Sequence, residues 1–375
     1  MRRCSVYILL TTFTFLTFNA CTVEKKMPAE LSAAIDSVGI KWVPDHRTGI
    51  FDLSSEYRSG KWHITAETNI PEAKRDLEEA INRILPAEKR EVKIDLLPSV
   101  DLGDSVYAVV NISVANMRKT PGHSAELIDQ GISGTVLRIL KKKRYWYLVQ
   151  TPTDYLGWMT GGSFVRFSEK GLEEWEQAPK VQVNFNYAQV FTRPDEKSPV
   201  LSDAVLGSVF RYLSTQGEWS EILLPDGIEG YIRTSFLRTY KSSDVSGKPD
   251  GEVIVRRARS LLGIPYLWGG NSSKAFDCSG FAGTVYKMEG RQLPRDANMQ
   301  AELGKKIVPD STYSNIEPGD LIFFGSPERV SHVGICLGGS YFIHCSDDVH
   351  INSLDESDPL FNAYRKRTFR FIKRL

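Results

Sequence analysis

The chain has 375 residues, of which 41% are hydrophobic, and its 47 Lys and Arg nearly balance its 46 Asp and Glu. This length predicts two to four domains with their own cores. The balanced charge gives no basic surface of the kind that binds nucleic acid, so we expect no nucleic-acid partner. The five cysteines form no C-x-x-C pair and no regular spacing, which argues against a disulfide framework and a zinc knuckle.

Residues 1–21, "MRRCSVYILLTTFTFLTFNAC", have the pattern of an export signal. Two arginines precede an apolar run that is too short to span a membrane, and a small residue stands before Cys21. The segment resembles a bacterial lipoprotein signal in which Cys21 carries the lipid, although Phe18 stands where leucine is usual. We therefore expect export to the cell envelope, with this lipid as the only membrane contact. Secretion with cleavage near this point is the alternative.

Residues 22–100 are predicted to form a tether and a small α+β segment. "PAELSAAIDSV" (28–38) is typical of a short helix, and "SGKWHITAETN" (59–69) of a strand. In "IPEAKRDLEEAINRIL" (70–85) apolar residues recur at helical spacing, and Pro71 suits the first turn of a helix.

Two similar segments follow, at 101–167 and 181–240. Three landmarks recur at one offset of 73 residues, since 207 − 134, 219 − 146 and 230 − 157 are equal: Gly134 with Gly207, Trp146 with Trp219, and Gly157 with Gly230. Short alternating runs broken by Gly, Pro and Asp predict small antiparallel barrels, and they resemble bacterial SH3-like domains. Such domains suggest ligand or wall binding, whereas the alternative makes both tryptophans core residues. A connecting helix (168–180), capped by Ser168, is expected between them, and a Ser/Gly/Pro-rich linker (241–250) after them.

The domain at 251–375 contains "AFDCSGFAGTVYKMEG", whose apolar positions predict a helix that begins at Cys278 with Asp277 as its N-cap. The first turn offers unpaired N–H groups and the positive end of the helix dipole. Both would lower the pKa of the Cys278 thiol and favour a nucleophilic thiolate. The same N–H groups could bind a developing oxyanion. The alternative is a buried cysteine that only anchors the helix.

A nucleophilic cysteine needs a base, and the base needs an orienting group. "SHVGICLG" and "YFIHCSD" predict a hairpin that carries His332 and His344. With an odd-length loop the two histidines would share one face, whereas a two-residue turn would place them on opposite faces. Cys336 and Cys345 are predicted to be core residues. A zinc site of Cys278, His332 and His344 is a further alternative.

The motifs "FDCSGF", "SHVGIC" and "FIHCS", with "YLWGG", "LPRDANMQ" and "PGDLIFF", resemble the NlpC-type cell-wall cysteine peptidases over residues 250–375. The repeats, "WVPDHRTGIFD" and "VNISVANMRKTP" also look like the multidomain γ-D-glutamyl-L-diamino-acid endopeptidases of that family. The resemblance implies a papain-like α+β fold with Cys278 as nucleophile, His332 as base and His344 as the residue that orients His332. It also implies that Tyr266 lies by the oxyanion site and that four residues line the pocket: Trp268, Asp277, Ser279 and Arg295.

The same resemblance implies that the first SH3-like domain walls the site. Glu126, Tyr155 and Asp296 would receive the free amine of an N-terminal L-alanine. The implied substrate is a peptidoglycan stem peptide, cut between D-glutamate and the diamino acid by a monomeric enzyme without a cofactor. Alternatives are the same chemistry on intact wall with the SH3-like domains as anchors, a lipid-anchored wall-binding protein, and Glu126 and Tyr155 as ordinary surface residues of the barrel.

Overall fold

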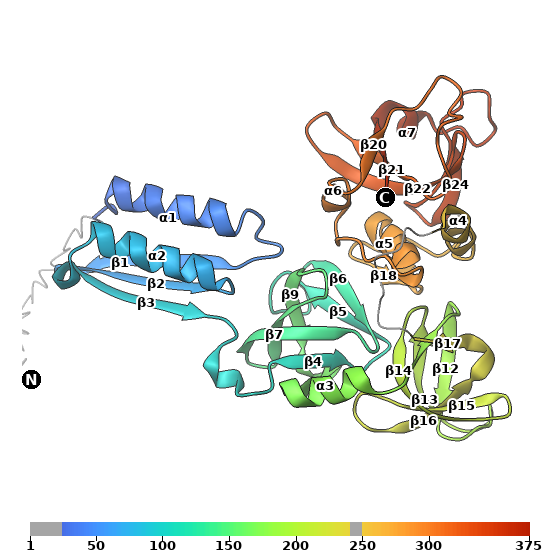
Figure 1. Ribbon diagram of the computed structural model, residues 1–375, viewed down its shortest axis with the longest axis horizontal. Coiled ribbons are helices and arrows are strands. Elements are labelled where there is room, and N and C mark those ends of the chain that lie inside the picture. The colour runs from blue at the N-terminus through green and yellow to red at the C-terminus, as the bar shows by residue number, and fades with distance from the viewer. Residues whose placement is uncertain (1–24, 241–249) are drawn as a thin grey trace, which may run out of the picture.

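The computed structural model describes residues 25–240 and 250–375. Along the chain we distinguish an N-terminal unit (25–100), a first barrel (101–167), a second barrel (181–240) and a C-terminal domain (250–375) (Figure 1). The predicted export signal with Cys21, and residues 241–249 of the predicted linker, lie outside the described residues. None of the helices in the described ranges is long and apolar enough to cross a bilayer.

The N-terminal unit is a three-stranded sheet with two helices, in agreement with the predicted α+β segment. Its elements are α1 (Ala29–Trp42), β1 (Phe51–Arg58), β2 (Lys61–Thr68), α2 (Pro71–Ile84) and β3 (Arg90–Leu96). Strand β2 pairs antiparallel with β1 and parallel with β3, and Leu31, Ile64 and Leu77 are fully buried between sheet and helices. Helix α1 runs past the predicted range and ends before Pro44, because a proline disfavours helical backbone in the preceding residue.

Each barrel is a seven-stranded sheet, and every strand of the first has a counterpart in the second. The first contains β4 (Tyr107–Val110), β5 (Val114–Arg118), β6 (Leu127–Ile132), β7 (Val136–Lys143), β8 (Trp146–Gln150), β9 (Leu156–Thr160) and β10 (Phe164–Phe167). The second contains β11 (Lys180–Val183), β12 (Tyr187–Phe191), β13 (Val200–Val205), β14 (Val209–Gln216), β15 (Trp219–Leu223), β16 (Glu229–Arg233) and β17 (Leu237–Thr239). The seven pairs of strand starts all differ by 73 (for example 180 − 107 and 237 − 164), so the repeat prediction is confirmed.

The landmark residues of the repeat have different surroundings in the two copies. Gly134 and Gly207 both have positive φ, at 85° and 89°, which is the left-handed conformation that favours glycine. Trp146 is 4% exposed and belongs to the core. Trp219 is only partly buried, and the guanidinium of Arg233 lies 4.4 Å from the centre of its ring. The core interpretation therefore holds for the first tryptophan and only partly for the second.

Helix α3 (Glu169–Gln177) joins the barrels, and the Ser168 hydroxyl accepts a hydrogen bond from the N–H of Gly171, as an N-cap does.

The C-terminal domain is a six-stranded antiparallel sheet in the order β20-β25-β21-β22-β23-β24, with helix α5 packed against it. Its helices are α4 (Gly251–Arg259), α5 (Cys278–Met288), α6 (Ala297–Gln300) and α7 (Ala363–Thr368). Its strands are β18 (Asn271–Ser272), β19 (Ala275–Phe276), β20 (Lys305–Ile307), β21 (Leu321–Gly325), β22 (Val330–Gly338), β23 (Tyr341–Cys345), β24 (Val349–Ser353) and β25 (Phe369–Arg374). Phe281 and Val285 of α5 pack with Ile335 and Ile343 of the sheet, which gives the α+β arrangement that the resemblance implied.

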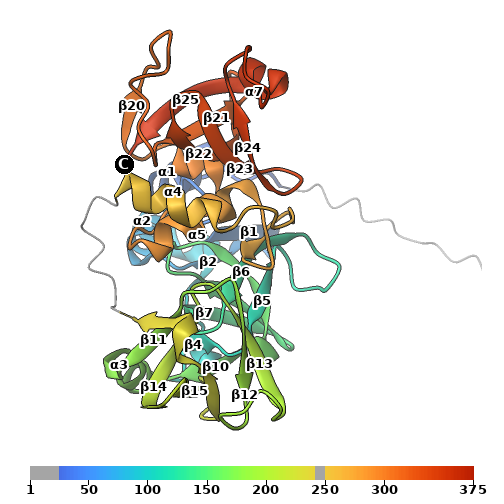
Figure 2. The ribbon, with the colours of Figure 1, turned by 90° about the vertical axis from the view of Figure 1, so that its right-hand side faces the viewer.

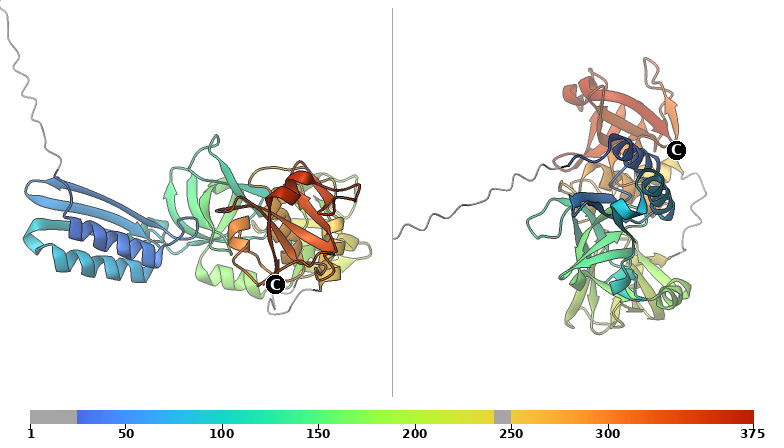
Figure 3. Two further views of the ribbon diagram at one scale, coloured as in Figure 1. Left: turned by 90° about the horizontal axis from the view of Figure 1, so that it is seen from above. Right: turned by 90° about the vertical axis from the view of Figure 1, so that its left-hand side faces the viewer.

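The four units contact one another, and three of them meet at the cavity that contains Cys278. The first barrel lies between the N-terminal unit and the C-terminal domain, and the second barrel lies beside it (Figures 1, 2 and 3). Ile50 and Leu97 of the N-terminal unit share a buried cluster with Leu140, Leu148 and Leu156 of the first barrel. Leu206 of the second barrel packs in the core of the C-terminal domain.

Candidate active site

Cys278 is the first residue of α5, and Asp277 is its N-cap, as predicted. The Asp277 carboxylate accepts a hydrogen bond of 2.7 Å from the N–H of Gly280. A side chain at Gly280 would overlap the carbonyl oxygen of Gly270, so only glycine lets the helix start so close to the preceding turn. Cys278 is 8% exposed and lies in the wall of a cavity.

The hairpin of β22 and β23 brings His332 and His344 onto one face by a route that the sequence did not predict. Gly338 pairs with Tyr341, so the turn has two residues, and we expected such a turn to separate the histidines. That expectation is wrong, because a β-bulge between Cys336 and Gly338 adds one residue to β22. The extra residue returns the His332 side chain to the face of the sheet that carries His344. His332 Nε2 lies 2.9 Å from His344 Nδ1.

A third residue, Asn352 of β24, determines which ring nitrogens carry protons. Its Oδ1 lies 2.9 Å from His344 Nε2, and the amide is oriented by Asn362 Nδ2, which donates to the same oxygen at 2.9 Å. Since an amide oxygen only accepts, His344 Nε2 carries the proton and His344 Nδ1 accepts from His332 Nε2. His332 Nδ1 is therefore the unprotonated nitrogen. The sequence analysis missed Asn352, although apolar and polar residues alternate over 349–352 and this pattern could have revealed it.

Burial sets the protonation of the Cys278 thiol and the His332 imidazole. It raises the pKa of the Cys278 thiol to about 11, with a further contribution from the charge of Asp277. The N–H groups of Val333 and Ser279 act against this rise in pKa and do not overcome it. Burial also holds the pKa of His332 well below its usual value. The expectation of a lowered thiol pKa is thus wrong, because burial outweighs the helix start, and the free protein holds a neutral thiol and a neutral imidazole.

Neutral partners can still perform nucleophilic chemistry if the proton moves as the sulfur attacks. His332 Nδ1 has the lone pair that such a base requires, and Cys278 and His332 line the same cavity. Neither His332 nor His344 forms a hydrogen bond to the thiol in the described structure. Catalytic hydrogen bonds of free enzymes are often long and shorten when substrate binds, so a small approach of the two groups suffices.

The cavity has a volume of about 630 Å³ and is lined by three of the four units. Tyr155 of the first barrel donates to Asp296 Oδ2 at 3.0 Å, and Trp268 Nε1 donates to Glu126 Oε1 at 3.1 Å. The first barrel therefore forms one wall of the site that contains the thiol. The predicted residues that line this cavity are Glu126, Tyr155, Tyr266, Trp268, Asp277, Cys278, Ser279, Asp296 and His332.

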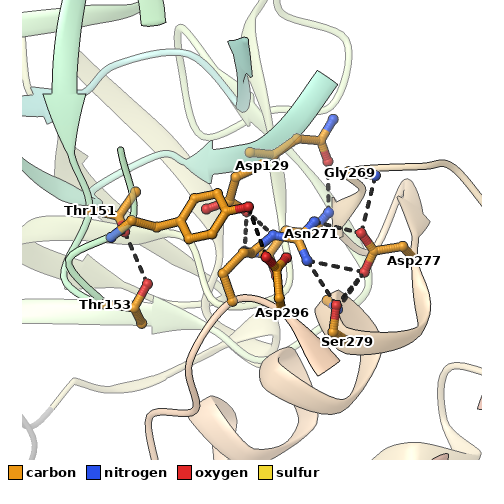
Figure 4. A network of polar contacts seen from close by, with 12 residues as sticks. Asp129, Thr151, Thr153, Gly269, Asn271, Asp277, Ser279 and Asp296 are labelled. Atoms are coloured by element: carbon orange, nitrogen blue, oxygen red, sulfur yellow. Dashed lines mark hydrogen bonds and ion pairs between the residues drawn. The ribbon is translucent and has the colours of Figure 1, made fainter. Parts of the chain in front are cut away.

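Arg295 and His344 are predicted site residues that do not line the cavity. Arg295 is 5% exposed, and its Nε and Nη2 lie 2.6 Å from carboxylate oxygens of Asp129 and Asp277. Its Nη1 donates to the Ser279 hydroxyl at 3.0 Å. Figure 4 shows these partners gathered between the first barrel and the start of α5. Arg295 thus joins β6 to the N-cap of α5, and we correct its predicted pocket-lining role to a positioning role.

Two further features concern residues outside the predicted site. Cys336 and Cys345 are 2% and 0% exposed, which confirms that they are core residues. Arg47 of the N-terminal unit lines the cavity, and its Nη1 lies 2.6 Å from Asp296 Oδ2. The motif "WVPDHRTGIFD" contains this arginine, but no single residue of it was singled out. The Asp-His-Arg run at 45–47, shortly after a helix end, was the available signal.

Comparison with known proteins identifies the domains. A model of the NlpC/P60 family matches residues 263–370, and a bacterial SH3 domain model matches residues 113–166 and 186–238. The protein is a cysteine peptidase with an NlpC/P60 domain. Dipeptidyl-peptidase 6 of Lysinibacillus sphaericus is 28% identical to this protein over 264 residues. These residues cover 68% of the present chain and 94% of the relative. The family matches begin at residue 113, so the N-terminal unit lies outside them.

Bacillus cereus provides a second relative and a solved structure of similar fold. A protein named Gamma-D-glutamyl-L-lysine dipeptidyl-peptidase is 29% identical over 233 residues, which cover 58% of this NlpC/P60 chain and 67% of the relative. The crystal structure of a B. cereus NlpC/P60 family protein superimposes with a TM-score of 0.62 at 24% identity and covers 72% of this chain and 99% of its own. That likeness shows a shared fold.

Proposed function

We propose that this peptidase hydrolyses the bond between the side-chain carboxyl of D-glutamate and the diamino acid in peptidoglycan stem peptides. We further propose that it acts on released peptides with a free N-terminal L-alanine. The names of two relatives, Gamma-D-glutamyl-L-lysine dipeptidyl-peptidases, support the bond. The observation that carries the free-amine part is the hydrogen bond of Tyr155 in the first barrel to Asp296, in the cavity that holds Cys278.

In the proposed mechanism the Cys278 sulfur attacks the scissile carbonyl carbon while the thiol proton passes to His332 Nδ1. The tetrahedral intermediate collapses, the C–N bond breaks, and His332 gives the proton to the leaving amine. Water then attacks the thioester, losing a proton to His332, and the acid leaves as the thiol re-forms. Burial and the neighbouring Cys278 raise the pKa of Tyr266, so its hydroxyl stays protonated and can donate to the carbonyl oxygen.

The selectivity for a free amine is electrostatic in this proposal. An ammonium group entering the cavity would meet the carboxylates of Asp296 and Glu126, and a charged pair in a partly buried site is stronger than one in water. Acylation of the amine removes the charge and leaves these carboxylates without a cation. Peptides still attached to sugar are acylated at this nitrogen, so they would be poor substrates.

The same proposal extends to the place of action and the state of the enzyme. We propose export to the cell envelope with a lipid on Cys21 as the only membrane attachment, and a monomer as the active form. The export-type segment at residues 1–21 supports the location.

The deciding experiment compares three substrates with the purified enzyme: L-Ala-γ-D-Glu-diamino acid, the same peptide acetylated at its amine, and intact sacculi. We expect kcat/KM for the free peptide to exceed that for the acetylated one by about 100-fold or more. A site discriminates strongly when the wrong ligand leaves its buried polar groups without a partner. Cys278→Ala is the control for background hydrolysis. Sacculi cleaved as readily as the free peptide would support wall remodelling, and no cleavage of any substrate would support a binding protein.

A further inference from the structure

The loop between α1 and β1, residues 43–50, enters the active-site cavity from the N-terminal unit. The N–H of Leu156 in the first barrel donates to the Arg47 carbonyl at 2.8 Å, and the N–H of Ile50 donates to Asn69 Oδ1 at 2.8 Å. Within the loop, the N–H groups of Thr48 and Gly49 both donate to the carbonyl oxygen of residue 45. These contacts hold the loop on the first barrel and fix where its side chains lie.

Arg47 uses its guanidinium to join two carboxylates. Its Nε and Nη2 donate to the Asp45 carboxylate at 2.9 and 2.6 Å, and its Nη1 donates to Asp296 Oδ2 at 2.6 Å and to Asn298 Oδ1 at 2.9 Å. The paired arginine lowers the pKa of Asp45, and the two carboxylates raise the pKa of Arg47. Asp45 compensates the charge of the arginine, so the three groups together keep one net negative charge for a ligand.

The two oxygens of Asp296 differ in their contacts. Oδ2 accepts from both Arg47 and Tyr155, at 2.6 and 3.0 Å, whereas Oδ1 accepts no hydrogen bond from any residue in the described ranges. The side chain of Asp296 is 26% exposed in the cavity wall. By contrast, the two oxygens of Glu126 accept from Trp268 at 3.1 Å and from Lys119 at 3.2 Å. Asp296 Oδ1 is therefore the acceptor that a substrate ammonium can use without displacing a protein group.

We infer that Arg47 is a specificity-determining positioning residue: it fixes Asp296 with one oxygen free for the ammonium group of the substrate. The N-terminal unit is then part of the substrate pocket, although it lies outside the matched family domains. This inference rests on the proposed free-amine function and adds the residue that sets it. Without Arg47, Asp296 loses its fixed orientation and Asp45 becomes an unpaired carboxylate beside it.

A purely electrostatic role for Arg47 predicts the opposite result. If the arginine only weakened the negative potential of Asp296, its removal would strengthen ammonium binding and raise the preference for the free amine. The ratio of kcat/KM for the free tripeptide to that for its N-acetyl form separates the two roles, because loss of positioning lowers the ratio. A general loss of folded enzyme changes both values equally and leaves the ratio unmoved.

The test uses the full chain with Arg47→Met, Arg47→Lys and, as a matched control, Arg83→Met at an exposed position of α2. We expect Arg47→Met to lower the ratio by about tenfold, mainly through a higher KM for the free tripeptide, with kcat within about twofold of wild type. Arg47→Lys keeps the charge without the planar fork and should recover part of the loss. Arg83→Met should leave the ratio unchanged.

Asp45→Asn is a second route to the same loss if Arg47→Met does not fold, because it removes the group that anchors the guanidinium. A ratio that stays constant or rises in the folded variants would overturn the inference while leaving the free-amine function in place. A wild-type enzyme that cuts both peptides equally would overturn the proposed function, and this inference with it.

Discussion

Asp129, Arg295 and Asp277 form a buried ion triad. Substitutions of its members should lower the free energy of unfolding by very different amounts. The side chains are 4%, 3% and 10% exposed in that order, and the three groups carry one net negative charge. Arg295→Met keeps the volume but leaves two buried carboxylates without a cation. Removing one partner of a buried pair costs about 3–5 kcal/mol, and here the partner removed serves both carboxylates. We therefore expect the free energy of unfolding to fall by at least about 3 kcal/mol.

Asp129→Asn should be far milder, although it removes a charge from the same triad. The pair of Arg295 and Asp277 that remains is neutral, and the new amide oxygen can still accept from Arg295. Burial raises the pKa of Asp129, so ionisation of this carboxyl opposes folding. The stability that the protonated carboxyl contributes is lost as the pH rises through the folded-state pKa. The expected loss in the free energy of unfolding is about 1 kcal/mol or less.

Urea unfolding of the full chain, followed by fluorescence and by activity, measures both variants. The matched control is Arg233→Met in the second barrel, whose ion pairs involve Glu196 and Glu218, with side chains 62% and 83% exposed. Exposed ion pairs contribute about 1 kcal/mol or less. Because Arg295 holds the cap of α5, its variant should also lose kcat. Equal destabilisation by Arg295→Met and Asp129→Asn would refute this reasoning.

Three further results are expected from the active-site domain. Asn352→Leu removes the acceptor that fixes the tautomer of the imidazole pair and should lower kcat by about tenfold or more with little change in KM; an unchanged kcat would contradict the proton assignment. The cation of Arg365 lowers the pKa of His332, so Arg365→Met should raise that pKa and move the acid limb of the pH–kcat/KM profile to higher pH, whereas the exposed neighbour Arg367→Met should not. Gly280→Ala places a methyl group against a backbone carbonyl and should lower the melting temperature by several degrees; a melting temperature equal to wild type would show that the turn can move.

The features that the sequence predicted well are those set within one element or one repeat. The helix at Cys278 follows from apolar spacing and from the capping aspartate next to it. The 73-residue repeat predicted two barrels whose strands correspond one by one. The hairpin that carries His332 and His344 follows from alternation in two short runs. In each case the deciding interactions lie within a few residues, where periodicity and capping rules apply.

The features that the sequence did not predict depend on single residues or on contacts between distant segments. The bulge at Leu337 changes the face of every residue before it, and no composition signal marks it. The link of Asn352 to the imidazoles requires the register of a third strand. Arg47 and Asp296 are 249 residues apart and meet only because the N-terminal unit docks on the first barrel through an apolar cluster.

This separation divides the tasks of the enzyme between its units. The groups proposed for bond cleavage all lie in the C-terminal domain, and burial keeps both Cys278 and His332 uncharged in the free enzyme. The charged groups proposed to select the substrate come largely from the other units, Arg47 from the N-terminal unit and Glu126 from the first barrel. A change in how these units dock would thus move Arg47 and Glu126 relative to Asp296 without moving the nucleophile. Specificity should therefore be more sensitive than kcat to substitutions in the apolar cluster around Leu156 that holds the N-terminal unit in place.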